Sequence, residues 1–156
     1  MRYISRLGSK YNPSDAVARS IRRAQWFERQ GSMGRRAGHV TRFRLARTWG
    51  VFVHQSASVG AIRFAHPSSV VIGAGVVVED EVMIWQNVTL GALDVGETDY
   101  PVIRRGAKLF AGSSVLGAVE VGEGAVVGAH SLVLSDVPAG ATVVGQPARV
   151  IRPQAD

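Results

Sequence analysis

The sequence contains no cysteine and no apolar run long enough to span a bilayer. The absence of cysteine excludes a disulfide framework, thiolate metal ligands and a cysteine nucleophile. The first ten residues, MRYISRLGSK, lack the apolar core of a secretion signal. Together these absences predict a soluble protein of the cytoplasm.

Acidic residues are scarce in the first third of the chain. Residues 1–50 contain 12 Lys and Arg against 2 Asp and Glu, whereas residues 51–156 contain 6 against 10. Such a basic segment can bind nucleic acid, a membrane surface or an anionic substrate, or it can be a solvated face that pairs with acidic surface elsewhere. We expect no nucleic-acid partner and favour an anionic acceptor substrate as the explanation.

The basic segment is predicted to be helical. A helix start signal at residues 13–15 precedes four apolar residues at helical spacing, which predicts a helix over residues 13–29. Gly31 and Gly34 are expected to break this pattern, and residues 35–48 are expected to form a second helix.

From Val51 onward the apolar residues follow a six-residue period, which neither a helix nor an amphipathic strand has. Each unit of a β-solenoid is one short strand plus a corner, and three units close a triangular coil of about 18 residues. Stacked coils of this kind bury a continuous aliphatic column. The aliphatic positions form three runs: Val53 and Val59; Ile72, Val78, Ile84 and Leu90; and Ile103, Leu109, Val115, Val121, Val127 and Val133.

The period fails twice, between Val59 and Ile72 and between Leu90 and Ile103. Each interval is 13 residues long, which is two units plus one residue. The first interruption lies in FAHPSS, which contains His66, and the second lies in ALDVGETDY, which is expected to loop out. Because a solenoid is rigid, we expect function where the period fails.

The repeats resemble those of the left-handed β-helix acyltransferases over roughly residues 36–152. The stretches VHQSASVG, IWQNVTLGA, FAHPSSVVIG and VGQPARVI are most similar to serine O-acetyltransferases and related polysaccharide O-acetyltransferases. The resemblance implies a mainly β fold. In this fold a short α-helical N-terminal segment (1–50) precedes a left-handed parallel β-helix of hexapeptide repeats (51–152) and a tail (153–156). It also implies acetyl transfer from acetyl-CoA to a hydroxyl in a homotrimer with active sites at subunit interfaces.

His66 occupies the position of the family's catalytic histidine. An imidazole titrates near neutral pH, so it can take the acceptor's hydroxyl proton and return it to the leaving thiolate. Tyr100 is a second catalytic candidate, at the acceptor hydroxyl. Trp85 and Asp99 are expected at the acceptor pocket, and backbone N–H groups after Leu90 are candidates for stabilising the oxyanion.

Small residues on the repeats are expected to line the cofactor groove. In the resemblance, Gly91, Ala111 and Ala129 let the pantetheine arm of acetyl-CoA approach the backbone closely. Arg149 is expected to meet a CoA phosphate, because a guanidinium matches phosphate geometry. We expect no metal in this site.

The chain departs from the serine acetyltransferases where those enzymes hold serine. Phe52 replaces the Asp that orients the catalytic histidine, and Ala65 replaces the Asp that precedes it. The family's Arg-His-Pro on the loop reads Asp99-Tyr100-Pro101. We therefore predict an acceptor other than free L-serine, such as a sugar, a polysaccharide or a modified amino acid.

Two alternatives stand beside this reading. The lost groups also fit a catalytically degraded scaffold or binding module on the same fold. A zinc lyase resembling γ-type carbonic anhydrase needs three His ligands, but His54, His66 and His130 are too far apart in the repeat register, and we expect His54 and His130 to be structural.

The first segment is shorter than the helical region that joins two trimers in serine acetyltransferases, which favours a simple trimer.

Overall fold

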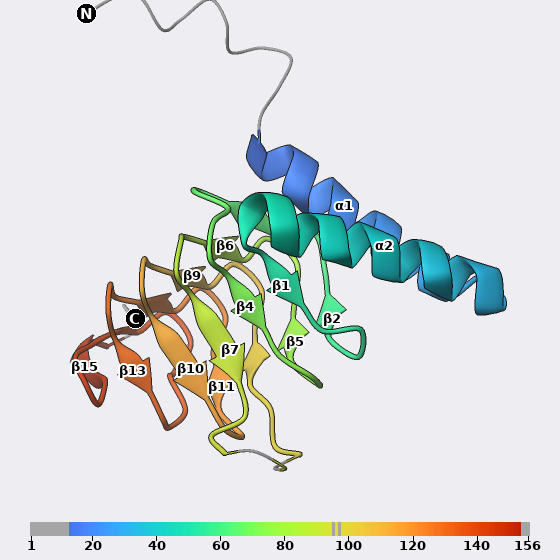
Figure 1. Cartoon of the computed structure of the whole chain (residues 1–156). Coiled ribbons are helices and arrows are strands. Elements are labelled where there is room, and N and C mark those ends of the chain that lie inside the picture. The colour runs from blue at the N-terminus through green and yellow to red at the C-terminus, as the bar shows by residue number, and fades with distance from the viewer. Residues whose placement is uncertain (1–12, 95, 97, 154–156) are drawn as a thin grey trace, which may run out of the picture.

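The computed structural model describes residues 13–94, 96 and 98–153. Two helices, α1 (Pro13–Glu28) and α2 (Gly31–Trp49), precede a series of very short strands. The helices lie side by side across one end of a column of strands (Figure 1). The helices predicted over 13–29 and 35–48 are confirmed, and α2 begins four residues earlier than expected. Residues 1–12 of the predicted N-terminal segment and residues 154–156 of the predicted tail lie outside the described residues.

The predicted helix break at Gly34 is wrong. Gly34 is buried within α2, where an added Cβ would overlap the carbonyl oxygen of Phe27 in α1. Gly38 is also buried, and an added Cβ there would lie 2.5 Å from Cγ of Glu28. Arg42 donates two hydrogen bonds to the Glu28 carboxylate, at 2.7 and 2.8 Å. The close contact between the helices offsets the poor helix propensity of glycine.

The strands form three sheets, in which each strand pairs in parallel with a strand of the next coil. Sheet A contains β1 (Phe52–Val53), β4 (Val71–Ile72), β7 (Thr89–Gly91), β10 (Ser114–Leu116) and β13 (Leu132–Val133). Sheet B contains β2 (Ser58–Val59), β5 (Val77–Val78), β8 (Val102–Ile103) and β11 (Glu120–Val121). Sheet C contains β3 (Arg63–Phe64), β6 (Met83–Ile84), β9 (Lys108–Leu109), β12 (Val126–Val127) and β14 (Thr142–Val144), along which β15 (Arg149–Arg152) returns antiparallel.

Successive strands belong to sheets A, B and C in turn, so the chain winds into a parallel β-helix with three edges. We call these the A–B, B–C and C–A edges, after the two sheets that the chain joins there. The fifth coil has only an isolated bridge, Val137 to Val121, in the place of a sheet B strand. No helix in the described part of the chain is long and apolar enough to cross a membrane.

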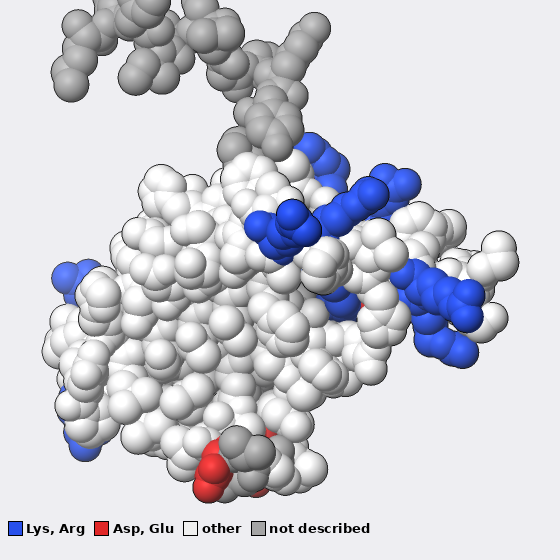
Figure 2. All heavy atoms as spheres, in the orientation of Figure 1, with Lys and Arg blue, Asp and Glu red and all other residues white. Residues whose placement is uncertain are grey.

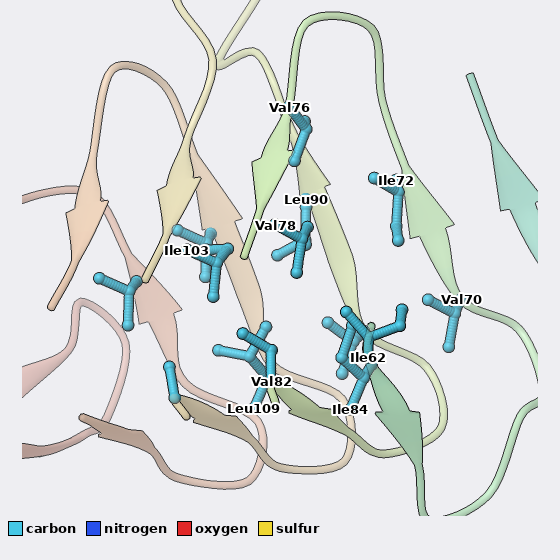
Figure 3. Packing of buried hydrophobic residues seen from close by; sticks show 14 of the residues in the cluster. Ile62, Val70, Ile72, Val76, Val78, Val82, Ile84, Leu90, Ile103 and Leu109 are labelled. Atoms are coloured by element: carbon cyan, nitrogen blue, oxygen red, sulfur yellow. The ribbon is translucent and has the colours of Figure 1, made fainter. Parts of the chain in front are cut away.

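The predicted aliphatic column is confirmed, since the members of all three six-residue runs are buried. Their side chains point inward between the three sheets and stack from coil to coil (Figure 3). Ile103 pairs with Val121, and Leu109 pairs with Val127, at the spacing of one coil. Each fully buried aliphatic side chain contributes roughly 1.5–3 kcal/mol of transfer free energy, so this column is the main source of stability.

Both interruptions lie where the sequence places them, but their sizes differ from the prediction. Phe64 in β3 follows Val59 after five residues and precedes Ile72 by eight, so the segment that contains His66 has two extra residues rather than one. Leu90 and Ile103 lie on consecutive strands, β7 and β8, so their interval is one unit with seven inserted residues. The repeat period alone did not reveal this insertion, because an interval of 13 residues equals two units plus one residue as well as one unit plus seven residues.

Candidate functional site

His66 lies at the C–A edge, in the link between β3 and β4. Its side chain is exposed, whereas the following Pro67 is buried. The backbone N–H of Ser68 donates to the His66 carbonyl at 2.9 Å, and that of Asn87 donates to the Ser68 carbonyl at 3.0 Å, which ties the link to the next coil. The imidazole has no hydrogen-bond partner among the residues that the structure describes. A fixed backbone thus presents an unpaired ring to the surroundings.

Two aromatic rings stack on the same edge. The Trp85 and Phe110 centroids are 4.3 Å apart, with 12° between the ring planes. The Ala65 N–H donates to Ile84, and the Trp85 N–H donates to Leu109, so Ala65, Trp85 and Phe110 follow one another on successive coils. Ala65, the residue before His66, therefore precedes the aromatic pair along this edge with only a methyl side chain.

Ala111 and Ala129 also lie at the C–A edge, where they follow β9 and β12. The N–H of Gly112 donates to the Gln86 carbonyl at 3.0 Å, and that of His130 donates to the Ala111 carbonyl at 2.9 Å. Small side chains therefore border the edge on the coils beyond the aromatic pair. The structure brings His66, Trp85, Ala111 and Ala129 onto one edge of the prism.

The C-terminal turn closes the far end of this edge. Gln146 Nε2 donates to the His130 carbonyl at 2.6 Å, and the Ala148 N–H donates to Leu132 at 2.7 Å. Arg149 begins β15 beside this turn and is exposed, with Nη1 donating to the Ala148 carbonyl at 2.8 Å. Arg149 is thus several coils away from His66.

Three other predicted site residues lie on the A–B side: Gly91 ends β7, and Asp99 and Tyr100 lie in the link between β7 and β8. The Tyr100 ring packs over Gly75, where an added Cβ would overlap the ring, and it also packs against the core. Asp99 is exposed, and a Cβ added at Gly91 would meet no atom within 4 Å. Within one chain, therefore, Tyr100 does not meet His66.

His54 is held at the A–B edge by turn contacts. Its Nδ1 accepts a hydrogen bond from the Ser56 N–H at 3.2 Å and lies 2.8 Å from Ser56 Oγ. Ser56 Oγ in turn accepts from the Gly75 N–H of the next coil at 3.1 Å. This arrangement agrees with a structural role for His54. No group of three or more His, Cys, Asp or Glu among the described residues could hold a metal ion.

Three residues on the C–A edge were not predicted as site residues, although His130 was named and expected to be structural. Phe110 stacks on Trp85, His130 is exposed with its ring over Gly112, and Gln86 has a buried side-chain oxygen without a hydrogen-bond partner in the described chain. The one-coil spacing from Gly112 to His130 could have placed His130 on this edge. No comparable signal marks Phe110, because the inserted loop separates it from Trp85 by more than one regular coil.

Comparisons with known proteins agree with this architecture, although no family model matches the chain. The serine acetyltransferase of Buchnera aphidicola subsp. Schizaphis graminum is 41% identical over 112 residues, which is 70% of this chain and 43% of that protein. The serine acetyltransferase of Escherichia coli K12 is 39% identical over 129 residues, which is 80% of this chain and 47% of that protein. The chain thus spans less than half the length of these two relatives.

A solved serine acetyltransferase in complex with CoA superposes on 86% of this chain and 55% of that one, with a TM-score of 0.77 and 34% identity. This likeness confirms the predicted fold, a left-handed β-helix of hexapeptide repeats.

Proposed function

The chain is a relative of the serine acetyltransferases, and on this premise we propose that it transfers an acetyl group from acetyl-CoA to a hydroxyl acceptor. The observation that carries the proposal is the exposed, unpaired imidazole of His66 on an edge lined with small residues. As the acceptor oxygen attacks the thioester carbonyl, His66 takes the hydroxyl proton. The C–S bond then breaks, and the proton passes from the imidazolium to the CoA thiolate.

Acetyl-CoA lies along the C–A edge in this proposal. The pantetheine arm passes the small residues Ala111 and Ala129, whose side chains leave the backbone accessible, and its thioester reaches His66. Arg149, exposed near the far end of the edge, meets a CoA phosphate. A solved relative that contains CoA supports the choice of cofactor.

The outer face of sheet A supports a homotrimer. Figure 2 looks onto this face and shows no Lys, Arg, Asp or Glu across its centre. Charged residues are normally depleted at the centre of protein interfaces, so an uncharged face suits contact with other copies. The outward residues of its five strands are Phe52, Val71, Thr89, Ser114 and Leu132.

A threefold assembly around sheet A also resolves the separation of the predicted site residues. If each prism turns sheet A toward the axis, the C–A edge of one copy meets the A–B edge of the next. His66 then faces the loop that contains Gly91, Asp99 and Tyr100 of the neighbouring copy. The neighbour's loop then supplies oxyanion donors. It also supplies a hydrogen-bond partner for the imidazole, which has none among the described residues of its own chain.

The acceptor in this proposal is a saccharide hydroxyl rather than free L-serine. Phe52 and Ala65 stand where the serine enzymes carry carboxylates, so the two acidic groups that flank the histidine in those enzymes are missing at these positions. Asp99 stands where those enzymes carry an arginine and would repel a carboxylate. The half-buried Trp85, on the same edge as His66, suits the apolar face of a sugar ring, since aromatic surfaces commonly line ligand pockets.

Measured CoA release with acetyl-CoA and a panel of acceptors tests the proposal. We expect turnover with sugars or oligosaccharides and little with L-serine. His66→Ala should lower kcat by about 10²–10⁴-fold, because a positioned base contributes that much. His39→Ala, an exposed histidine on α2, is the matched control and should leave kcat unchanged. Full activity of His66→Ala would refute the mechanism. No turnover, together with no CoA binding by the wild type, would favour the degraded scaffold.

A further inference from the structure

The helical hairpin formed by α1 and α2 carries an unusual excess of arginine. Residues 13–50 contain nine arginines, no lysine, and only two acidic residues, Asp15 and Glu28. Arg42 is bound to Glu28 and largely buried. The other eight are exposed and form no ion pair with any described residue, and they are Arg19, Arg22, Arg23, Arg29, Arg35, Arg36, Arg44 and Arg47.

Large apolar side chains are interleaved with these arginines instead of being buried. Met33 is 83% exposed, Phe43 is 64% exposed and Val40 is 52% exposed. Met33, Arg36, Val40, Arg44 and Arg47 recur at intervals of three or four residues, and Phe43 follows Val40 by three, so all six share one face of α2. An ordinary solvated helix face carries charges of both signs and few large apolar groups. This face combines a single sign of charge with exposed apolar surface.

The two helices enclose a groove with the same chemistry. Arg23 of α1 lines one side, Arg36 and Arg44 of α2 line the other, and Val40 and Trp49 contribute apolar surface. Figure 2 shows Lys and Arg gathered over α1 and α2, above the uncharged face of sheet A. We call the groove and the adjoining outer face of α2 the hairpin surface, which consists of Arg23, Met33, Arg36, Val40, Phe43, Arg44, Arg47 and Trp49.

The hairpin surface combines positive charge with exposed apolar side chains, and a partner must match both. A second copy of the hairpin would bring arginines against arginines without acidic partners. A nucleic-acid duplex would pair with the guanidinium groups through its phosphates but would leave Met33, Val40 and Phe43 in water, and of these three a single strand could stack its bases only on Phe43. The boundary of an anionic bilayer satisfies both, because its phosphates bind arginine bidentately and its acyl region takes apolar side chains.

We propose that the hairpin surface docks on a membrane rich in anionic phospholipid, with its arginines at the phosphates and Met33, Val40 and Phe43 at the headgroup–acyl boundary. The protein then binds the bilayer peripherally. The proposal stands independently of acetyl transfer. It also accounts for the confinement of the basic charge to the part of the chain outside the β-helix.

Co-sedimentation of the full chain with lipid vesicles tests the proposal. We expect binding to vesicles of phosphatidylglycerol and phosphatidylcholine and little binding to phosphatidylcholine alone. Each arginine near an anionic surface contributes about fivefold to partitioning, so Arg36→Gln/Arg44→Gln should weaken binding by about thirtyfold. Lys108→Gln/Arg152→Gln removes the same charge from the β-helix and should leave binding nearly unchanged.

A second arm tests the apolar contribution. Val40→Ser/Phe43→Ser should reduce vesicle binding about tenfold or more without lowering the melting temperature, because both side chains are exposed. The proposal is overturned if wild type does not bind anionic vesicles. It is equally overturned if Lys108→Gln/Arg152→Gln loses as much vesicle binding as Arg36→Gln/Arg44→Gln. It is also overturned if wild type binds a single-stranded oligonucleotide as tightly as it binds anionic vesicles, and the Val40→Ser/Phe43→Ser variant loses no vesicle binding. That result would indicate a nucleic-acid partner. A change of oligomeric state in the serine variant would instead indicate contact between copies.

Discussion

At the scale of single residues, Arg104 illustrates how the prism uses charge. Its guanidinium lies between two carboxylates of neighbouring coils on the B–C side. Nη1 donates to Glu79 Oε1 at 2.9 Å, and Nη2 donates to Glu120 Oε2. Hydrogen bonds from Arg104 hold the pKa of Glu79 and the pKa of Glu120 below their ordinary values, with a further contribution to Glu79 from the Arg105 N–H.

These lowered pKa values predict a pH dependence of stability. A carboxyl group whose pKa is lower in the folded state stabilises the fold above its unfolded pKa, and this contribution is lost as the pH falls through the folded pKa. Wild type should therefore lose stability below about pH 4.3, the ordinary value for glutamate. Arg104→Gln should be less stable than wild type at pH 7. It should also lose less stability than wild type as the pH falls below about 4.3.

Thermal melting between pH 7 and pH 3 measures this difference. Lys108→Gln, which removes an equal charge without breaking an ion pair, is the control and should follow wild type. Parallel pH profiles of wild type and Arg104→Gln would show that the ion pairs do not support the fold. The pairs are exposed, so the effect is expected to be small and to shrink at high salt.

At the scale of elements, the corners set the geometry of each coil. Three successive corners of the B–C edge have left-handed backbone, with φ of 68°, 66° and 67° at Gly106, Gly124 and Gly140. A side chain in this conformation crowds the following carbonyl, which glycine avoids. Gly124 shows this cost most simply, because an added Cβ would meet no other atom within 4 Å.

Gly124→Ala should therefore lower the free energy of unfolding by about 1 kcal/mol through backbone strain alone. Gly124→Asn should cost less, because asparagine tolerates left-handed backbone better than alanine. Urea unfolding of the three proteins checks the order. If Gly124→Ala leaves the free energy of unfolding unchanged, the backbone at this corner relaxes without a measurable cost.

The sequence predicts the aliphatic column of the β-helix well, but it predicts the packing of the helix hairpin and the aromatic stack poorly, and each outcome has a physical reason. Every predicted member of the aliphatic column is buried, because each inward position of a coil must be apolar and the period of six is rare elsewhere. Phe64 and Val143, which are also buried in sheet C, fall outside the three predicted runs. The break at Gly34 was wrong because packing of α1 against α2 outweighs local propensity. The stack of Trp85 on Phe110 was not predicted, since the loop insertion removes Phe110 from the one-coil spacing.

At the scale of the whole molecule, the proposed active site exists only between copies. His66 lies on one edge of the prism, whereas Gly91 and Tyr100 lie toward another. The proposed threefold arrangement around the uncharged face of sheet A would join them. The same arrangement places three hairpins at one end of the assembly, so membrane docking would be multivalent.

Subunit mixing tests this arrangement. His66→Ala removes the base, and Gly91→Trp places a bulky side chain on the A–B side, at a position where an added Cβ would meet no atom within 4 Å. Each homotrimer should be inactive. In a randomly mixed assembly about a quarter of the interfaces combine an intact His66 with an intact Gly91, so about a quarter of wild-type activity should return. If no activity returns in verified mixed trimers, the site lies within one chain.

A crystal structure of the wild-type protein with CoA is the most direct test of the central claim, that the C–A edge presents His66 to a thioester. We predict density for the pantetheine arm along Ala111 and Ala129, with the CoA sulfur beside the His66 imidazole and the neighbouring copy's loop across from it. CoA bound at a different edge, or His66 turned away from the sulfur toward its own chain, would contradict the account.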